Sequence, residues 1–302
     1  MVTTHVPPTV DKPSPLAMVS ALPHWKGHVD IKPLSGGVSN ASFAVTDATG
    51  AYVARVGKDY PFHQVNRERE AAASRAAFTC GLSPELLFAS DGLSVLRFIE
   101  GLTYTAADVR ANWLACLDLV QRTHRDMGKH ITGQGAIFWV FQILRDYARQ
   151  LTSANHRLAA EIPRWLEIVD SLESAQIPMP IVFGHHDLLA ANFMHDSKRL
   201  WLIDWEYGAF GTPLFDLANL AANNSFDALT EQDMLRHYFG KPDQAIQRAF
   251  AAMKVASALR EALWGMVSEL NLNAPGVDYV AYAHDYLARF DIVHADYCRN
   301  FR

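Results

Sequence analysis

Three oxygen-bearing side chains follow two short apolar runs in the middle of the sequence: Asp187, Asn192 and Asp204. Asp187 and Asn192 share the loop after residues 181–183, and Asp204 ends the run 200–203. Short apolar runs are typical of buried strands, so the strand ends should bring these side chains together. One carboxylate could orient a hydroxyl group and take its proton, while the second carboxylate and the amide oxygen could hold Mg²⁺. The pattern therefore favours phosphoryl transfer to a hydroxyl group.

The segment that contains these residues resembles a known family. The spacing His-x-Asp-x₄-Asn, which begins at His185, and the later Asp204 match the catalytic loop and metal-binding aspartate of protein kinase-like enzymes. Ile-Asp-Trp-Glu at 203–206 is similar to the motif that replaces Asp-Phe-Gly in the choline/ethanolamine kinase and aminoglycoside phosphotransferase superfamily. The run 184–224 most resembles the bacterial choline kinase branch, and a looser resemblance extends from about 34 to about 270.

This resemblance implies an α+β, two-lobed protein kinase-like fold. Residues 1–100 would form a nucleotide-binding lobe, with an antiparallel sheet and one main helix. Residues 101–302 would form a larger, mostly helical lobe that carries catalysis and substrate binding. The length of 302 residues agrees with two lobes, because a domain commonly has about 150 residues.

The residue patterns also change near Gly101. Before it, strands are predicted over 29–31, 43–45, 52–56, 86–88 and 93–99, with one helix over 64–80. After it, Thr105 is a suitable N-cap for a first helix. Further helical patterns then cover 106–127, 138–151, 158–172, 215–223, 231–239, 243–272 and 277–299.

The first lobe contains candidates for binding ATP. Ser35, Gly36 and Gly37 lie between two predicted strands, where paired glycines let the backbone approach phosphate oxygens closely. A plain hairpin turn is the alternative, and the catalytic loop elsewhere in the chain favours the phosphate-binding interpretation. The resemblance further implies that the backbone around Phe98 and Glu100 holds the adenine ring.

Arg55 is the candidate for charge neutralisation at the phosphates. Strand alternation places it opposite the apolar face of its strand, although a lone arginine in a strand is more commonly exposed to solvent. The resemblance implies that Arg55 contacts the phosphates and pairs with a glutamate of the helix predicted over 64–80. The resemblance favours Glu70, which lies fourteen residues before Pro84, with Glu68 as the alternative, and Lys58 is the alternative to Arg55.

The acceptor would bind to the second lobe. Trp264 lies beside the apolar stripe of the helix predicted over 243–272 and shares a polar face with Ser257, Arg260, Glu261 and Ser268. In the choline kinases that the chain resembles, a tryptophan in a matching Leu-Trp-Gly segment lines the site for a quaternary ammonium. A cation–aromatic contact of this kind contributes about 0.5–2 kcal/mol. Val267 stands where some relatives have a second aromatic residue. Further candidates for substrate contact are Tyr207, Trp205 and Glu206.

The resemblance implies an ATP- and Mg²⁺-dependent kinase of a small amino alcohol, most closely choline or ethanolamine. A thiamine or aminoglycoside kinase of the same superfamily is the alternative. A nucleotide-binding protein without catalysis is disfavoured, because Asp187, Asn192 and Asp204 are all present. A metallohydrolase built on His185 and His186 is also disfavoured, since adjacent histidines rarely face one metal ion.

The composition excludes several other classes. A net charge of −5 argues against a nucleic-acid partner, which would usually require a basic excess. The three cysteines are scattered and suggest no disulfide framework or zinc site. Residues 1–15 lack the pattern of a signal peptide, and no apolar run approaches the ~20 residues that span a membrane. The sequence predicts a cytoplasmic enzyme with no membrane or nucleic-acid partner.

Overall fold

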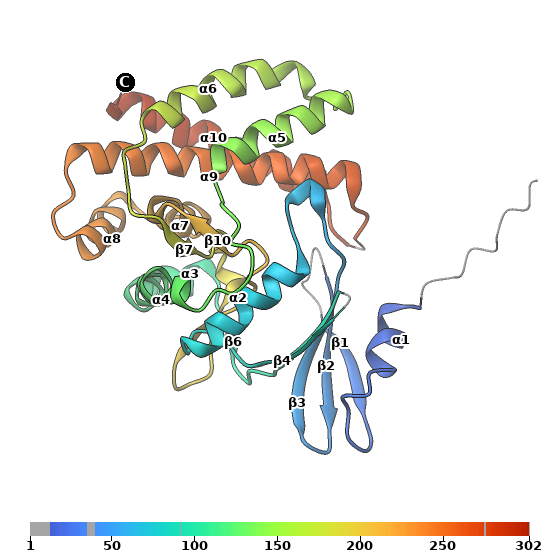
Figure 1. Ribbon diagram of the computed structural model, residues 1–302. Coiled ribbons are helices and arrows are strands. Elements are labelled where there is room, and N and C mark those ends of the chain that lie inside the picture. Colours follow the sequence, from blue (N-terminus) through green and yellow to red (C-terminus); the bar gives the residue numbers. More distant parts are fainter. Residues whose placement is uncertain (1–12, 35–39, 91, 275, 302) are drawn as a thin grey trace, which may run out of the picture.

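A five-stranded antiparallel sheet forms the first part of the chain (Figure 1). The computed structural model describes residues 13–34, 40–90, 92–274 and 276–301. The strands lie in the order β1, β2, β3, β5 and β4, and each pairs antiparallel with its neighbours. Their bounds are β1 Asp30–Leu34, β2 Ala41–Asp47, β3 Gly50–Val56, β4 Leu86–Ser90 and β5 Leu93–Arg97.

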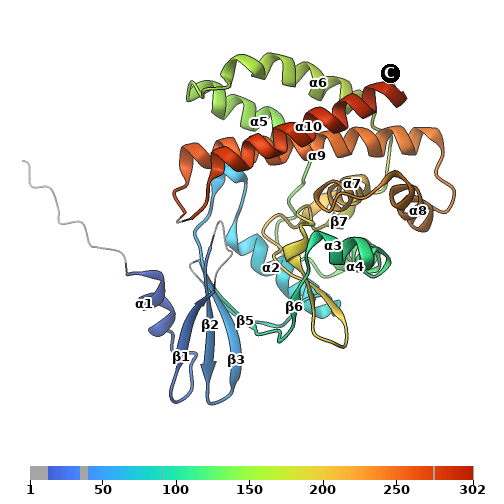
Figure 2. The same cartoon turned by 180° about the vertical axis from the view of Figure 1, so that it is seen from behind.

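One face of this sheet packs against the short helix α1 (Pro15–Ser20), which lies beside it (Figure 2). The core on that face consists of Val19, Phe43, Val45, Tyr52, Ala54, Leu93 and Val95. Successive side chains of a strand point to opposite faces, so Arg55 of β3 lies on the other face. That face looks toward helix α2 (Arg67–Thr79), which begins at the N-cap Asn66 and carries Glu70 in its first turn.

The second part of the chain is mostly helical, and its helices pack around α9. This 28-residue helix (Gln244–Asn271) contacts α5, α7 and α10, and α10 runs alongside it (Figure 1). Nearly every residue between Ala249 and Ser268 is buried, so α9 forms the centre of the main hydrophobic core. The other helices are α3 Ala106–Ala111, α4 Trp113–Asp126, α5 Val140–Ser153, α6 Ile162–Ser174, α7 Pro213–Asn223, α8 Ala228–Phe239 and α10 Tyr279–Phe301.

The segment that contains Asp187, Asn192 and Asp204 is built from short strands. β8 and β9 form a hairpin, and β6 pairs with the outer side of β8. β7 pairs with β10, which follows the hairpin in the chain. The bounds are β6 Leu102–Thr103, β7 Val182–Gly184, β8 Phe193–His195, β9 Leu200–Leu202 and β10 Ala209–Gly211.

The structure confirms the α+β class and the two kinds of lobe, and it corrects one helix. The helix predicted over 106–127 is interrupted at Asn112, where the backbone leaves the helical conformation. Asn112 Nδ2 donates to the carbonyl of Asp108 at 2.9 Å and so closes α3 before α4 begins. Thr105 caps α3 as predicted, with a reciprocal hydrogen bond from its backbone to the Asp108 side chain.

In the ranges that the structure describes, no helix combines the length and the apolar character needed to cross a lipid bilayer.

The boundary between the lobes at residues 100 and 101 stays a prediction. Gly101 lies where the chain passes the β8–β9 hairpin, and a Cβ atom there would lie 2.5 Å from the carbonyl oxygen of His195. The crossing point therefore requires glycine.

Candidate active site

A fully buried carboxylate of α7 holds the loop that follows β7. Asp216 accepts hydrogen bonds from the backbone N–H groups of His185 at 2.8 Å and His186 at 2.7 Å. His124 Nε2 lies 2.9 Å from the same carboxylate. Burial alone would raise the pKa of Asp216, but the neighbouring histidines and the His124 hydrogen bond lower it below its usual value. Asp216 therefore fixes the backbone immediately before Asp187 as a buried anion.

We expect Asp216→Asn to lower the free energy of unfolding by about 3 kcal/mol, because an amide group would face one of these N–H donors. The pKa of Asp216 is depressed in the folded state, so its ionised form stabilises the fold above the unfolded pKa of about 4. Urea unfolding at pH 7 should show the loss, and the difference from wild type should shrink as the pH falls below about 4. Asp233→Asn, on the exposed face of α8, is the matched control and should change stability by less than about 1 kcal/mol. Equal stability of both variants at pH 7 would contradict this role.

The predicted catalytic loop brings Asp187 and Asn192 into direct contact. Asn192 Nδ2 donates to the backbone carbonyl of Asp187 at 2.7 Å and to Asp187 Oδ2 at 3.2 Å. His185 Nδ1 accepts from the Asp187 N–H at 3.2 Å, and its Nε2 then donates to the carbonyl of Ile203 at 2.9 Å. Burial and the negative charge of Glu261 raise the pKa of Asp187 well above its usual value. A carboxylate with a raised proton affinity is suited to taking a proton from a hydroxyl group.

Asp204 is joined to this loop and to the first lobe. The N–H of Ile203 donates to the backbone carbonyl of Asn192 at 2.9 Å, which places Asp204 directly beyond the end of β9. Arg55 Nη2 lies 2.8 Å from Asp204 Oδ1. Burial would raise the pKa of Asp204, but the ion pair with Arg55 outweighs burial and holds the pKa below its usual value. Asp204 is therefore a carboxylate that stays ionised at the junction of the two lobes.

Arg55 also pairs with the glutamate that the sequence favoured. Arg55 Nη1 lies 2.9 Å from Glu70 Oε1, and both side chains are largely buried. Glu68, the alternative partner, is exposed on α2. Lys58, the alternative to Arg55, is exposed, and its ammonium lies 5.9 Å from the Tyr60 ring centroid. The structure thus brings Arg55 and Glu70 together, and their contact with nucleotide phosphates stays a prediction.

Arg67 belongs to the same charge network and was missed by the sequence reasoning. Its Nη1 lies 2.6 Å from Glu70 Oε2 and 3.0 Å from Glu206 Oε2. Burial and the negative charge of Asp204 raise the pKa of Glu206 to about 7. Arg67 is the first residue of α2 and stands three positions before Glu70, a spacing that brings helix side chains together. That spacing is the signal that could have identified it.

The other nucleotide-binding candidates are placed less fully. Ser35, Gly36 and Gly37 lie outside the described residues. Phe98 and Glu100 are exposed and line a 370 Å³ pocket beside Trp201 of the β8–β9 hairpin. Adenine binding by the backbone at these two residues stays a prediction.

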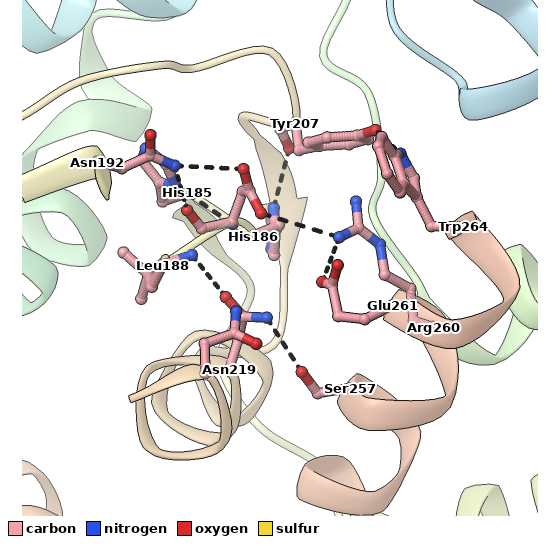
Figure 3. A network of polar contacts seen from close by, with 12 residues as sticks. His185, His186, Leu188, Asn192, Tyr207, Asn219, Ser257, Arg260, Glu261 and Trp264 are labelled. Carbon is pink, nitrogen blue, oxygen red and sulfur yellow. Dashed lines mark hydrogen bonds and ion pairs between the residues drawn. The ribbon is translucent and has the colours of Figure 1, made fainter. Parts of the chain in front are cut away.

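The aromatic candidates divide into two groups. Trp205 is 2% exposed, donates from Nε1 to Ser83 Oγ at 2.7 Å, and packs its ring against His185. The Trp205 ring belongs to the core under the catalytic loop, and its contact with a substrate stays a prediction. Trp264 and Tyr207 lie together, and Trp264 Nε1 donates to the Tyr207 hydroxyl at 2.9 Å (Figure 3).

Two charged residues of α9 complete the surroundings of Asp187. Arg260 Nη1 lies 2.6 Å from Glu261 Oε1 and 3.9 Å from Asp187 Oδ1 (Figure 3). Both side chains are almost fully buried. In the sequence they stood out only as polar residues on the face of α9 that carries Trp264. The sequence signal for Arg260 was a charged residue beside the apolar stripe of a long helix. Its partner Asp187 lies 73 positions away and could not be identified from local spacing.

The donor set fits a hard divalent cation. Both recorded hydrogen bonds of the Asn192 amide use Nδ2, which leaves Oδ1 as a possible ligand, and Asp204 supplies a carboxylate at the same junction. Mg²⁺ commonly takes only one or two protein oxygens and keeps water and phosphate oxygens as its other ligands. Among the described residues there is no group of three or more His, Cys, Asp or Glu side chains suited to a metal ion. His185 and His186 contact different backbone carbonyls, so their rings do not converge as a metallohydrolase site would require.

The lobes and the Asp187 site together define a phosphotransferase with a protein kinase-like fold. A sequence model described as the phosphotransferase enzyme family (APH) matches residues 30–254, and the chain belongs to that family. It is therefore a small-molecule kinase.

Individual relatives agree with this assignment. Protein LicA of Haemophilus influenzae is 24% identical over 238 residues, which cover 76% of this chain and 70% of that protein. The probable ethanolamine kinase of Arabidopsis thaliana is 26% identical over 291 residues, covering 83% of this chain and 76% of the relative. The solved structure of a choline/ethanolamine kinase family protein from Mesorhizobium loti has a TM-score of 0.73 and 27% identity, and the match covers 92% of each chain. These likenesses support the two-lobed fold and the resemblance to choline/ethanolamine kinases.

Proposed function

We propose that this protein transfers the γ-phosphate of ATP, with Mg²⁺, to the hydroxyl group of a small amino alcohol, with choline and ethanolamine as the candidates. One observation carries the proposal: Asp187, Asn192 and Asp204 lie close together at the lobe junction. Asn192 is hydrogen-bonded to Asp187, and Arg55 forms an ion pair with Asp204. The names of the relatives support an amino alcohol as the acceptor, because they include ethanolamine kinases and choline/ethanolamine kinases.

Asp187 is the proposed base. Its carboxylate accepts a hydrogen bond from the acceptor hydroxyl, orients the oxygen toward the γ-phosphate, and takes the proton late in the transfer. Asn192 holds Asp187 in place through Nδ2, and its Oδ1 together with Asp204 would hold Mg²⁺. When bound, Mg²⁺ supplies positive charge that neutralises the phosphate oxygens.

Arg55 is the proposed protein cation for the leaving diphosphate. Glu70 and Asp204 fix its guanidinium from two sides, so it would be oriented before the nucleotide binds. A preorganised charge of this kind stabilises the transition state more than a charge that must reorganise during the reaction. Glu206, which Arg67 holds at the same junction, is proposed to act through a second ion or a water molecule.

The test is an ATP- and Mg²⁺-dependent phosphorylation assay with choline, ethanolamine, thiamine and kanamycin. We expect turnover of choline or ethanolamine to exceed that of the other two by at least about tenfold. Preferred turnover of thiamine or kanamycin would keep the phosphoryl chemistry and discard the amino alcohol. No turnover of any acceptor, with ATP still bound, would contradict the proposed function and favour a nucleotide-binding protein without catalysis.

A further inference from the structure

Arg260 places a protein cation against the aromatic ring that was predicted to receive the substrate cation. Its guanidinium carbon lies 4.3 Å from the centroid of the Tyr207 ring, within the range of a cation–aromatic contact. Figure 3 shows the guanidinium between the Tyr207 ring and Glu261. Its Nη1 lies 3.9 Å from Asp187 Oδ1. The residue is 1% exposed. One face of the Tyr207 ring is therefore occupied by a protein cation.

The contacts of Arg260 hold this cation firmly. Glu261 Oε1 lies 2.6 Å from Arg260 Nη1, and Glu261 Oε2 accepts a hydrogen bond from the Tyr282 hydroxyl at 2.8 Å. Moving the guanidinium away would leave the buried carboxylate of Glu261 without its counter-ion, which is strongly unfavourable. An incoming substrate cation cannot easily displace Arg260 from Tyr207.

Trp264, the other aromatic residue predicted to contact the substrate, is also partly covered. His63 stacks on Trp264, with ring centroids 5.0 Å apart and an interplanar angle of 17°. His63 is fixed by the Tyr147 hydroxyl at 3.0 Å and by Ser268 Oγ at 2.8 Å. A trimethylammonium group, which depends on aromatic faces for recognition, thus finds one face of each predicted ring already occupied.

Charged and hydrogen-bonding groups dominate what remains around the acceptor position. Arg260 Nε and Nη2 have no hydrogen-bond partner in the part of the chain that the structure describes. Neither kind of ammonium group can accept a hydrogen bond from these donors, so the discrimination rests on the carboxylates nearby. Glu206 lines the same small pocket as Tyr207 and Arg260, and Asp187 Oδ1 lies 3.9 Å from Arg260 Nη1. An ammonium with N–H donors can form hydrogen bonds to such carboxylate oxygens, whereas a trimethylammonium cannot.

We propose that Arg260 is a specificity-determining residue that selects an acceptor with an N–H-bearing ammonium group over one with a trimethylammonium group. The inference rests on the proposed function, because the acceptor hydroxyl must reach Asp187. In an amino alcohol such as ethanolamine the nitrogen is two carbons from that hydroxyl, so it falls close to the guanidinium. There an ammonium with N–H groups can donate hydrogen bonds to carboxylate oxygens, while a trimethylammonium group cannot.

A graded methylation series tests this selection. The kcat/KM values of ethanolamine, N-methylethanolamine, N,N-dimethylethanolamine and choline are measured for wild type, Arg260→Met and Lys254→Met. We expect kcat/KM of wild type to fall along the series, and Arg260→Met to shift the choline-to-ethanolamine ratio toward choline by about tenfold. Lys254→Met is the matched control, because it removes an ion-paired cation from the same helix and should leave the ratio unchanged. A wild-type preference for choline, or an unchanged ratio in Arg260→Met, would overturn the proposal.

A binding measurement separates this inference from the proposed function. Tetramethylammonium has no hydroxyl group, so its affinity, measured by calorimetry, is independent of turnover. We expect Arg260→Met to bind it about tenfold more tightly than wild type does. Equal affinity in the two proteins would overturn the selection, whereas tighter binding without turnover of any amine would refute only the proposed function. If Arg260→Met does not fold, the double variant Arg260→Met/Glu261→Gln replaces it, because this variant removes both buried charges. Its affinity for tetramethylammonium is compared with that of wild type in the same way.

Discussion

Asp187→Asn is expected to lower kcat for the preferred amino alcohol by about 10³-fold, because the variant cannot take the hydroxyl proton. ATP affinity should stay within about threefold of wild type, since Asp187 contacts the acceptor side of the site rather than the predicted nucleotide side. The fold should persist. Asparagine has nearly the same shape, and its oxygen can still accept the hydrogen bond from Asn192 Nδ2.

Asp187→Asn should lower kcat but should not lower the stability of the fold. Burial and Glu261 raise the pKa of Asp187, so its ionised form is destabilised in the folded state above the unfolded pKa of about 4. The unfolding temperature of Asp187→Asn at pH 7 should therefore equal or exceed that of wild type. Asp170→Asn, an exposed aspartate on α6, is the control and should change neither quantity appreciably. Turnover of Asp187→Asn within a few fold of wild type would remove Asp187 from the mechanism.

Asp204→Asn is expected to lower kcat by at least about a hundredfold and to raise the Mg²⁺ concentration needed for half-maximal activity. The substitution weakens the proposed ion site and also releases one side of Arg55, whose other carboxylate partner is Glu70. Both changes act on the phosphate side of the site. The KM for the amino alcohol should therefore change much less than the dependence on Mg²⁺ and ATP.

A Mg²⁺ titration at saturating ATP distinguishes this role from a purely structural one. Arg55→Lys is the informative comparison, because it keeps a cation near Asp204 and loses the two-sided geometry of the guanidinium. It should raise the KM for ATP while leaving the Mg²⁺ requirement closer to wild type. An Asp204→Asn enzyme with an unchanged Mg²⁺ requirement would contradict the assignment of Asp204 as a metal ligand.

The sequence predicted the parts of the site that depend on local spacing. Asp187 and Asn192 lie on one loop, and Asp204 ends the neighbouring strand of a hairpin, so chain continuity alone brings them close. Alternation along β3 likewise placed Arg55 opposite the apolar face, because side-chain direction in a strand has a period of two.

The features that the sequence did not reveal depend on contacts between distant segments. Trp205 stands between two site residues, yet its ring packs under His185 and bonds Ser83, a partner more than a hundred positions away. Arg260 meets Asp187 only because α9 crosses the catalytic loop, and no periodic pattern encodes that crossing. The break at Asn112 was missed because helix periodicity does not register a side chain that bonds back to the preceding turn.

The position of α9 has a consequence for how such an enzyme could acquire a new acceptor. Asp187 and Asp204, the residues proposed for phosphoryl transfer, lie on the β7–β9 segment, whereas Arg260, Glu261 and Trp264, which we propose to face the acceptor, project from one stretch of α9 (Figure 3). The two tasks can therefore diverge separately. Because the same stretch of α9 is the centre of the core, each change of acceptor preference also alters packing. New specificities should thus evolve in steps that pair a substitution on α9 with a compensating one on α5, α7 or α10.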